Sequence, residues 1–493
     1  MMDLARVAGP VACLGLAVLL VGRSRRDRAA GLAFAALGAC LLGASLAPDA
    51  PGTIAAGVAA AVAASALLAV AFRRMPWLLP AAALACVPAR LALHVHGSGS
   101  KLLVPLYVVI AGAALLLASE LLRDEPRSRE LRLAAWPLAA YLAWTGVSLA
   151  WSKDVHAGAI ELLAFYVPFT VLAIALARLP WSALGLRILY SEAAVMALVF
   201  AAVGFYQYET RDVFQNPKVI YGNAFAPFFR VNSVFWDPSV YGRFLVVAMV
   251  PSIVVLVRGR GRWLPLAAAG AIAVTWLGLL ISFSQSSFAA LLVVVVGAAA
   301  VAWRWRALLA VVVAVAVLAG IASSEPAVRR SIQHHTTSGL NSATSGRYNL
   351  VANGIRIAEA HPLQGVGVGG FKRAYAERVP RLKAKEPKKA ASHNTPVTVA
   401  AETGIVGLGL FLWLLGALFV QAFGRVDRTL GGRTSLVAGL ALAGILCHSL
   451  FYNDFFEDPT TWGLLGLLAL AARPAPPPPQ PVPAEAPKEA VPV

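Results

Sequence analysis

The chain has 493 residues, of which 59% are hydrophobic and 13% are charged. A soluble domain carries about 25% charged residues, so this composition excludes an ordinary soluble protein and predicts one that crosses a membrane many times. The net charge of +18 could indicate a nucleic-acid partner, but the Lys and Arg residues stand in short clusters between apolar runs. Such clusters encode the orientation of membrane helices, and we therefore exclude nucleic acid as a partner.

Apolar runs close to the roughly 20 residues that span a bilayer recur along the chain. They predict an all-α polytopic membrane protein, a bundle of about 12 to 15 transmembrane helices. The predicted helices are 7–22, 29–47, 52–72, 76–95, 102–122, 131–151, 158–178, 187–207, 241–258, 263–281, 285–303, 306–322, 396–423, 434–452 and 460–472. Basic linkers fall at every second turn and should be cytoplasmic, which places the C-terminus inside and the N-terminus outside.

These predictions divide the chain into five parts. Residues 1–75 form an N-terminal group of helices, and residues 76–322 form a transmembrane core with an outer loop at 210–241. Residues 323–396 are polar and should form one large extracytoplasmic loop with short helices, and 397–473 return to the membrane. Residues 474–493 are a disordered tail rich in Pro and Ala. Because polar backbone near hydrocarbon must be satisfied by protein or water, we interpret the large loop as an active-site loop.

The first half of that loop offers an arginine and a glycine run. Arg347 follows Ser345 and Gly346 at the start of a predicted amphipathic helix, where an anion would meet free backbone N–H groups and a guanidinium. On residue type alone, a solvated surface arginine is the favoured alternative. The run from Gly365 to Gly370 resembles a phosphate-binding loop but follows no predicted strand, so it predicts a tight turn rather than a nucleotide site.

The second half of the loop offers basic residues and a histidine. Lys372 and Arg373 begin a basic run that could face lipid headgroups or attract an anionic substrate. His393, followed by Asn394, stands where the loop re-enters the membrane, and histidine is the side chain most easily poised as a base near neutral pH. A loop histidine is more often merely hydrogen-bonded. Residue chemistry does not choose between His393 and the competing loop histidines, which are His334, His335 and His361.

The outer loop 210–241 brings Arg230 and Arg243 close to the membrane edge, where the alternative to a functional role is snorkelling at the interface. None of the outer loops holds an Asp-x-Asp pair, and the chain shows no zinc-ligand spacing. We therefore expect neither a metal nor another cofactor.

Several short motifs occur in a characteristic order between about Ala140 and Phe456. They are Leu149–Asp154, Arg230–Pro238, Ser345–Arg347, His361–Gly367, His393–Asn394 and Ala401–Gly407. In this order the chain resembles the O-antigen ligase and O-antigen polymerase superfamily, which includes bacterial O-linked oligosaccharyltransferases. The helices before residue 75 look like an addition to that pattern.

The resemblance implies a metal-independent inverting transferase at the outer face of the cytoplasmic membrane. Such enzymes move a glycan from a polyprenyl (undecaprenyl) diphosphate carrier to an acceptor hydroxyl. Carried over by position, Arg347 and Arg230 hold the diphosphate and His393 is the essential loop histidine. As hypotheses we add donor capture by Arg243, Lys372 and Arg373, and substrate contacts by Tyr221, Trp236 and Asn394.

Three acceptors remain open: a lipid core for a ligase, a repeat unit for a polymerase, or protein serines and threonines for an oligosaccharyltransferase. The outward-facing segment Asn453–Asp458 could hydrogen-bond the acceptor or could simply cap a helix. A transporter is the more distant alternative, with Arg90, His94 and His96 as the start of a path. A non-catalytic scaffold would leave Arg347 and His393 unexplained.

Overall fold

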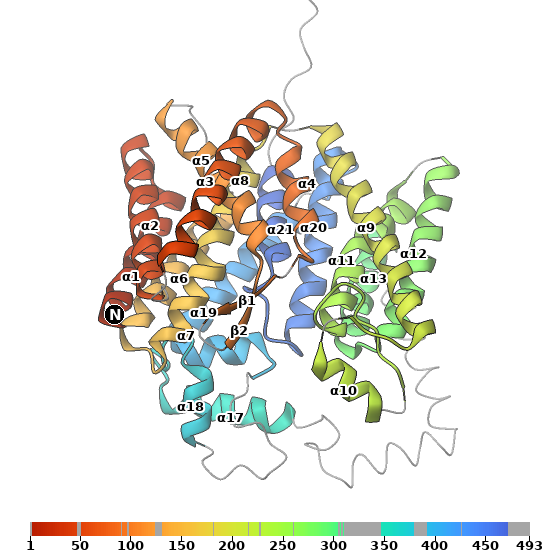
Figure 1. Ribbon diagram of the computed structural model, residues 1–493. Helices are drawn as coiled ribbons and strands as arrows, with labels where there is room; N and C mark the ends of the chain where they lie inside the picture. Colours follow the sequence, from red (N-terminus) through yellow and green to blue (C-terminus); the bar gives the residue numbers. More distant parts are fainter. Residues whose placement is uncertain are drawn as a thin grey trace, which may run out of the picture.

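The computed structural model describes residues 2–46, 51–89, 91–95, 98–123, 131–180, 182–214, 216–225, 228–259, 261–303, 306, 309, 347–378, 392–424 and 426–471. Within these ranges the chain is a bundle of helices, drawn in Figure 1. Eleven of the described helical segments are long and apolar enough to cross a membrane. The predicted fold class, an all-α polytopic membrane protein, is confirmed.

The N-terminal elements are α1 (Met2–Val21), α2 (Arg25–Leu46), α3 (Pro51–Arg74), α4 (Leu78–Ala85), β1 (Leu91–Val95), β2 (Ser98–Leu102) and α5 (Val104–Leu122). Helices α1 and α2 approach so closely that a Cβ added to Gly15 would lie 2.4 Å from the backbone nitrogen of Ala35. Small residues allow this contact in lipid, where packing drives helix association.

The predicted helix 76–95 is wrong. Helix α4 ends at Ala85, and the chain then forms an antiparallel hairpin in which Leu91 pairs with Leu102. Pro88 has no N–H to continue a helix and restricts the residue before it to extended conformations, so the helix stops there. His94 lies in β1, whereas residues 90 and 96 are outside the described part.

The central elements are η1 (Arg132–Ala134), α6 (Ala135–Ser148), η2 (Leu149–Trp151), α7 (Val155–Glu161), the π-turn η3 (Leu162–Tyr166), α8 (Val167–Arg178), α9 (Ala183–Thr210), α10 (Pro217–Phe225), α11 (Pro238–Arg258), α12 (Trp263–Ser282) and α13 (Gln285–Trp303). The long helices among them follow the predicted apolar runs closely. Pro238 is the first residue of α11, where its missing N–H removes no helical hydrogen bond. Most of the predicted helix 306–322 lies outside the described residues.

The last elements are α17 (Arg347–Ala360), α18 (Phe371–Arg378), α19 (Thr395–Phe423), α20 (Leu430–Ser449) and α21 (Pro459–Ala471). Helix α17 matches the predicted amphipathic helix. Helices α10, α17 and α18 lie at the same end of the bundle in Figure 1, which is the end that the sequence predicts to be extracytoplasmic. Residues 323–346 and 379–391 of the predicted loop and the tail 474–493 lie outside the described part.

Candidate active site

The glycine run after α17 docks the large loop onto the bundle. Gly365, Gly367 and Gly369 have φ angles of 67°, 84° and 73°, a left-handed region that residues with a Cβ rarely adopt. A Cβ on Gly367 would lie 2.3 Å from the Cα of Ser152, and one on Gly369 would lie 2.3 Å from the nitrogen of Gly158. Only glycine therefore allows the turn to lie this close to the neighbouring backbone.

Backbone hydrogen bonds hold the docked turn on α19. The N–H of Val366 donates to the carbonyl of Ala401 (2.9 Å), and the N–H of Gly367 donates to the carbonyl of Glu402 (2.8 Å). The Glu402 carboxylate accepts from the N–H of Phe371 at 3.1 Å. Helix α19 bends where these bonds form, since Gly404 has a φ of 68° inside the helix. The run is a tight turn, as predicted, and its N–H groups are used within the protein.

The segment after α6 holds the other side of the turn. The hydroxyl of Ser152 donates to the carbonyl of Val368 at 2.8 Å, and the hydroxyl of Ser148 accepts from the Val368 N–H at 3.1 Å. The indole of Trp144 donates to the carbonyl of Thr403 at 2.8 Å. Three motifs that are far apart in the sequence, Leu149–Asp154, His361–Gly367 and Ala401–Gly407, thus form one structural joint.

A tight turn fixes His393 just before α19. His393 has a φ of 55°, an unfavourable conformation for a residue with a Cβ. The Ser392 hydroxyl donates to the carbonyl of Asn394 at 2.7 Å and accepts from the N–H of Asn394 at 3.0 Å. Backbone strain of this kind persists where the surroundings impose it, and it clusters at functional sites.

Asn394 itself has a structural role. Its side-chain oxygen accepts from the N–H of Val397 at 3.0 Å and caps α19, while its side-chain nitrogen donates to the carbonyl of Leu450 at 3.0 Å. Both polar ends of the amide are therefore occupied by protein. These bonds fix the backbone beside His393, and substrate contact by Asn394 stays a prediction.

Arg230 is fixed at the outer end of α12. Its Nε donates to the carbonyl of Ser282 at 3.1 Å, and its backbone N–H and carbonyl both bond to the side chain of Asn223. Asp237 begins α11 by accepting from the N–H of Ser239 at 2.7 Å. The short segment from Arg230 to Asp237 is thus held at both ends.

Arg230 and His393 both lie close enough to Arg347 and Asp237 for those two charges to influence their pKa values. Burial lowers the pKa of His393 below its ordinary value; the positive charge of Arg347 lowers it further, and the carboxylate of Asp237 opposes both. Burial likewise lowers the pKa of Arg230, again opposed by Asp237 and assisted by Arg347. Arg347 thus acts electrostatically on both of the other predicted catalytic residues, which come from segments distant in sequence. Within the described part of the chain, no carboxylate forms an ion pair with Arg347.

Arg243 lies behind this site and is not available to a donor. Its side chain is buried and forms ion pairs with Asp454 and with Asp458, the latter at 3.0 Å. Because Arg243 is buried beside two carboxylates that would repel a phosphate, the prediction that Arg243 captures the donor is corrected to an interior ion pair. The same contact shows that Asp454 and Asp458 are buried at the end of the outer segment 450–458 and do not face an acceptor.

A line of rings joins the ion pair to His393. The ring of Tyr452 lies 6.1 Å from that of His393 and 5.7 Å from that of His448, and His448 Nδ1 lies 3.9 Å from a carboxylate oxygen of Asp454. Tyr452 and Asp237 lie near His393, and neither was assigned a role from the sequence. Asp237 belongs to the motif Arg230–Pro238, so the sequence could have indicated a role for it. Tyr452 lies in none of the motifs, so the sequence contained no such indication.

The remaining predicted substrate residues lie at the rim. Lys372 and Arg373 are exposed on α18, where Arg373 pairs with Glu377 at 3.3 Å. Tyr221 is exposed on α10, and the carbonyl of Trp236 accepts from the side chain of Asn216 at 2.8 Å. Substrate contact by these residues stays a prediction. Among the described residues, no group of three His, Cys, Asp or Glu side chains is arranged to hold a metal ion.

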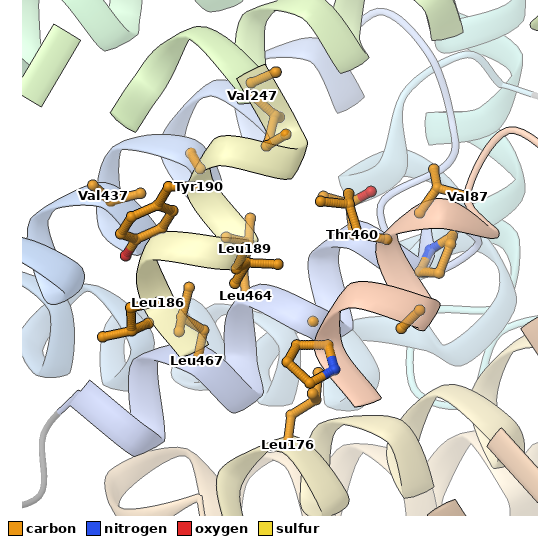
Figure 2. Close-up of a pocket in the computed structure, with 18 of the residues that line it drawn as sticks. Val87, Leu176, Leu186, Leu189, Tyr190, Val247, Val437, Thr460, Leu464 and Leu467 are labelled. Atoms are coloured by element: carbon orange, nitrogen blue, oxygen red, sulfur yellow. The ribbon is translucent and has the colours of Figure 1, made fainter. Parts of the chain in front are cut away.

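An apolar cavity of about 380 Å³ lies among the membrane helices next to the ion pair. Figure 2 shows Leu186, Leu189 and Tyr190 of α9 with Leu464 and Leu467 of α21 around this space. Its lining extends from Ser182, at the start of α9, to Arg243 and Asp458. The cavity therefore runs along the helices toward the end of the bundle that carries the site.

A comparison with protein families matches residues 270–412 to the family model described as O-antigen ligase. No curated protein matches the chain. The matched segment contains Arg347, the glycine turn and His393, and it supports a place for the chain in the O-antigen ligase superfamily. Arg230 and Asp237 lie outside the matched segment, and the fold places them near its residues Arg347 and His393.

Proposed function

We propose that this chain, a member of the O-antigen ligase superfamily through its segment 270–412, transfers a glycan from a polyprenyl diphosphate carrier to an acceptor hydroxyl. The observation that carries the proposal is that Arg230 and His393, from segments distant in sequence, both lie within the electrostatic influence of Arg347 and Asp237. We place this site at the outer face of the cytoplasmic membrane, as the distribution of basic linkers predicts.

In the proposed reaction, the acceptor oxygen attacks the anomeric carbon as the bond from that carbon to the phosphate oxygen breaks. Attack from the opposite face inverts the anomeric carbon, and the bonding electron pair leaves with the diphosphate. Arg230 and Arg347 donate charge-assisted hydrogen bonds to the phosphate oxygens, and these bonds strengthen as negative charge grows there. Because fixed cations stabilise the leaving group, the proposed reaction requires no metal.

His393 takes the proton of the acceptor hydroxyl in the same step. Burial and Arg347 lower its pKa, so the imidazole is neutral at neutral pH and can accept a proton. Asp237 then stabilises the imidazolium that forms, which afterwards returns the proton to water. A positioned base of this kind typically contributes about 10²–10⁴-fold to the rate.

The apolar cavity supports a lipid-linked donor. Its volume of about 380 Å³ lies within the range of small-ligand sites, and its lining is dominated by Leu, Val and Ala side chains. We propose that part of the carrier chain enters it while the diphosphate reaches the two arginines. The carboxylates that pair with Arg243 would repel a phosphate, so the charged group belongs at Arg230 and Arg347 rather than at the cavity's end.

The test is transfer of a labelled glycan from a polyprenyl diphosphate donor by the purified protein with chelator present. The acceptors are a lipid-linked core, a free repeat unit and a serine-rich peptide, and the productive one defines the subtype. Product formation with any acceptor supports the proposal. Donor that crosses proteoliposomes unchanged, with no product from any acceptor, would contradict it and favour the transporter.

A further inference from the structure

Helix α10 (Pro217–Phe225) carries an apolar side that the protein does not cover. Ile220, Tyr221, Ala224 and Phe225 are exposed and follow the spacing of one side of a helix. Tyr221 and Phe225 are 70% and 74% exposed, and their ring centroids are 4.7 Å apart. Lys218 lies at the edge of this side, where its long side chain can carry the ammonium group to water. A short helix with an exposed aromatic side and a flanking lysine is suited to lie in a membrane interface.

The elements next to α10 mark where that interface lies. Helix α9 ends with aromatic side chains, among them Tyr208, whose ring is covered by the guanidinium of Arg211 at 4.3 Å. Phe228, which follows α10, stacks on Phe283 at the end of α12 with centroids 4.7 Å apart. Aromatic rings with arginine at the ends of membrane helices are typical of the interface. The ends of α9 and α12 at this side of the bundle therefore carry the side chains that are typical of the interface.

The other side of α10 holds both ends of the segment that carries two site residues. The side chain of Asn223 bonds to the carbonyl (2.9 Å) and the N–H (3.0 Å) of Arg230. The side chain of Asn216, just before the helix, donates to the carbonyl of Trp236 at 2.8 Å, next to Asp237. The position of α10 thus sets the position of the backbone at Arg230 and beside Asp237.

We infer that α10 lies in the outer leaflet of the bilayer and positions Arg230 through the hydrogen bonds of Asn223. The apolar side binds lipid hydrocarbon, and the asparagine side holds the loop from Arg230 to Asp237 at membrane level. Asn223 is a positioning residue because it acts on the reaction only through Arg230. This second part of the inference rests on the proposed function, whereas the placement of α10 does not.

The placement is tested by spin labels in liposomes. The four native cysteines are first replaced, and they are Cys13, Cys40, Cys86 and Cys447. A nitroxide is then attached at Phe225→Cys or, as the control, at Arg373→Cys on the polar helix α18 at the same end of the bundle, where the side chain is 61% exposed.

We expect the label at 225 to collide more often with oxygen, which concentrates in lipid, and the label at 373 to collide more often with a water-soluble nickel chelate. Equal access of the chelate to both labels would overturn the placement of α10 in the bilayer.

The positioning role is tested by transfer kinetics. Misplacement of a binding group by about 1 Å can cost up to about 10²-fold, so we expect Asn223→Ala to lower kcat/KM by about 10–100-fold. Asn353→Ala removes a comparable side-chain bond of 2.9 Å within α17 and should leave kcat/KM unchanged. Asn223→Ala added to Arg230→Ala should cost nothing further, because the two changes act through one group.

Full additivity of the two changes would overturn the positioning role. If the wild type transferred no glycan to any acceptor, the proposed function and the role of Asn223 would both fall. The spin labels would still decide separately whether α10 lies in the membrane interface.

Discussion

Arg230 and Arg243 flank the same short segment but have opposite surroundings. The Arg230 guanidinium bonds to one backbone carbonyl, and Asp237 acts electrostatically on both Arg230 and His393. Arg243 is 5% exposed and lies between Asp454 and Asp458. A guanidinium carries five N–H donors, so Arg230 retains donors for a phosphate, whereas Arg243 is buried beside two carboxylates that would repel one. The partners of an arginine, rather than its place at a membrane edge, decide whether it binds substrate or stabilises the fold.

The largest effect is expected from the removal of Arg243. Arg243→Ala leaves two buried carboxylates without their cation, and we expect a loss of about 3–5 kcal/mol in the free energy of unfolding. Thermal unfolding in detergent measures the loss. Replacing the whole group, with Arg243→Met, Asp454→Asn and Asp458→Asn together, should recover most of it. An unchanged unfolding temperature with weaker donor binding would return Arg243 to the binding site.

Removal of an arginine from the other group should affect the reaction instead. We expect Arg347→Ala to lower kcat by about 10²–10³-fold, because it removes a donor to the charge that grows in the transition state. Arg356→Ala, at an exposed position on the same helix, is the control and should be neutral. Steady-state transfer and unfolding temperature are measured together. If kcat fell equally in Arg347→Ala and Arg356→Ala, the loss would reflect a general sensitivity of α17 to substitution, and Arg347 would have no specific role in the reaction.

The joint beneath the site should respond to a single methyl group. In Gly367→Ala, the new Cβ would meet Ser152 at a φ of 84°, and we expect a cost of at least about 1–3 kcal/mol. Gly409 has no neighbour within 4 Å of an added Cβ, so Gly409→Ala should be harmless. Limited proteolysis between residues 347 and 394 reports undocking of the loop. The same cleavage rate in both variants would show that the glycine turn does not hold the loop.

The smallest expected effect is a shift in the pH profile. The logarithm of kcat/KM should fall at low pH as His393 gains a proton, with a midpoint below the ordinary histidine pKa of about 6.5. Asp237 raises the pKa of His393, so Asp237→Asn should move this acid limb to still lower pH, while asparagine keeps the helix cap. A shift to higher pH, or none, would remove Asp237 from the neighbourhood of the base.

Much of the fold was predictable because apolar length and basic linkers determine how a chain crosses a bilayer. The prediction of a helix over 76–95 was wrong because it rested on the length of the apolar run and did not take account of Pro88, which ends the helix. The order of the motifs along the chain predicted Arg230, Arg347 and His393 as site residues. Residue chemistry alone did not distinguish them from the other arginines and histidines of the outer loops. The ion pairs of Arg243 could not be predicted, because its carboxylates follow α20 and reach it only through the packing of α11 and α20. The contact of Tyr452 with His393 could not be predicted either, because it too depends on how the helices pack.

In the proposed reaction His393 is the base, whereas Arg230 and Arg347 hold the donor. The most direct test is single-turnover transfer alongside donor binding for the wild type and His393→Ala, with chelator present and the productive acceptor in excess. We expect His393→Ala to bind donor as the wild type does but to lose about 10²–10⁴-fold in the rate of the chemical step. Transfer at the wild-type rate, or loss of donor binding with an unchanged chemical step, would contradict it.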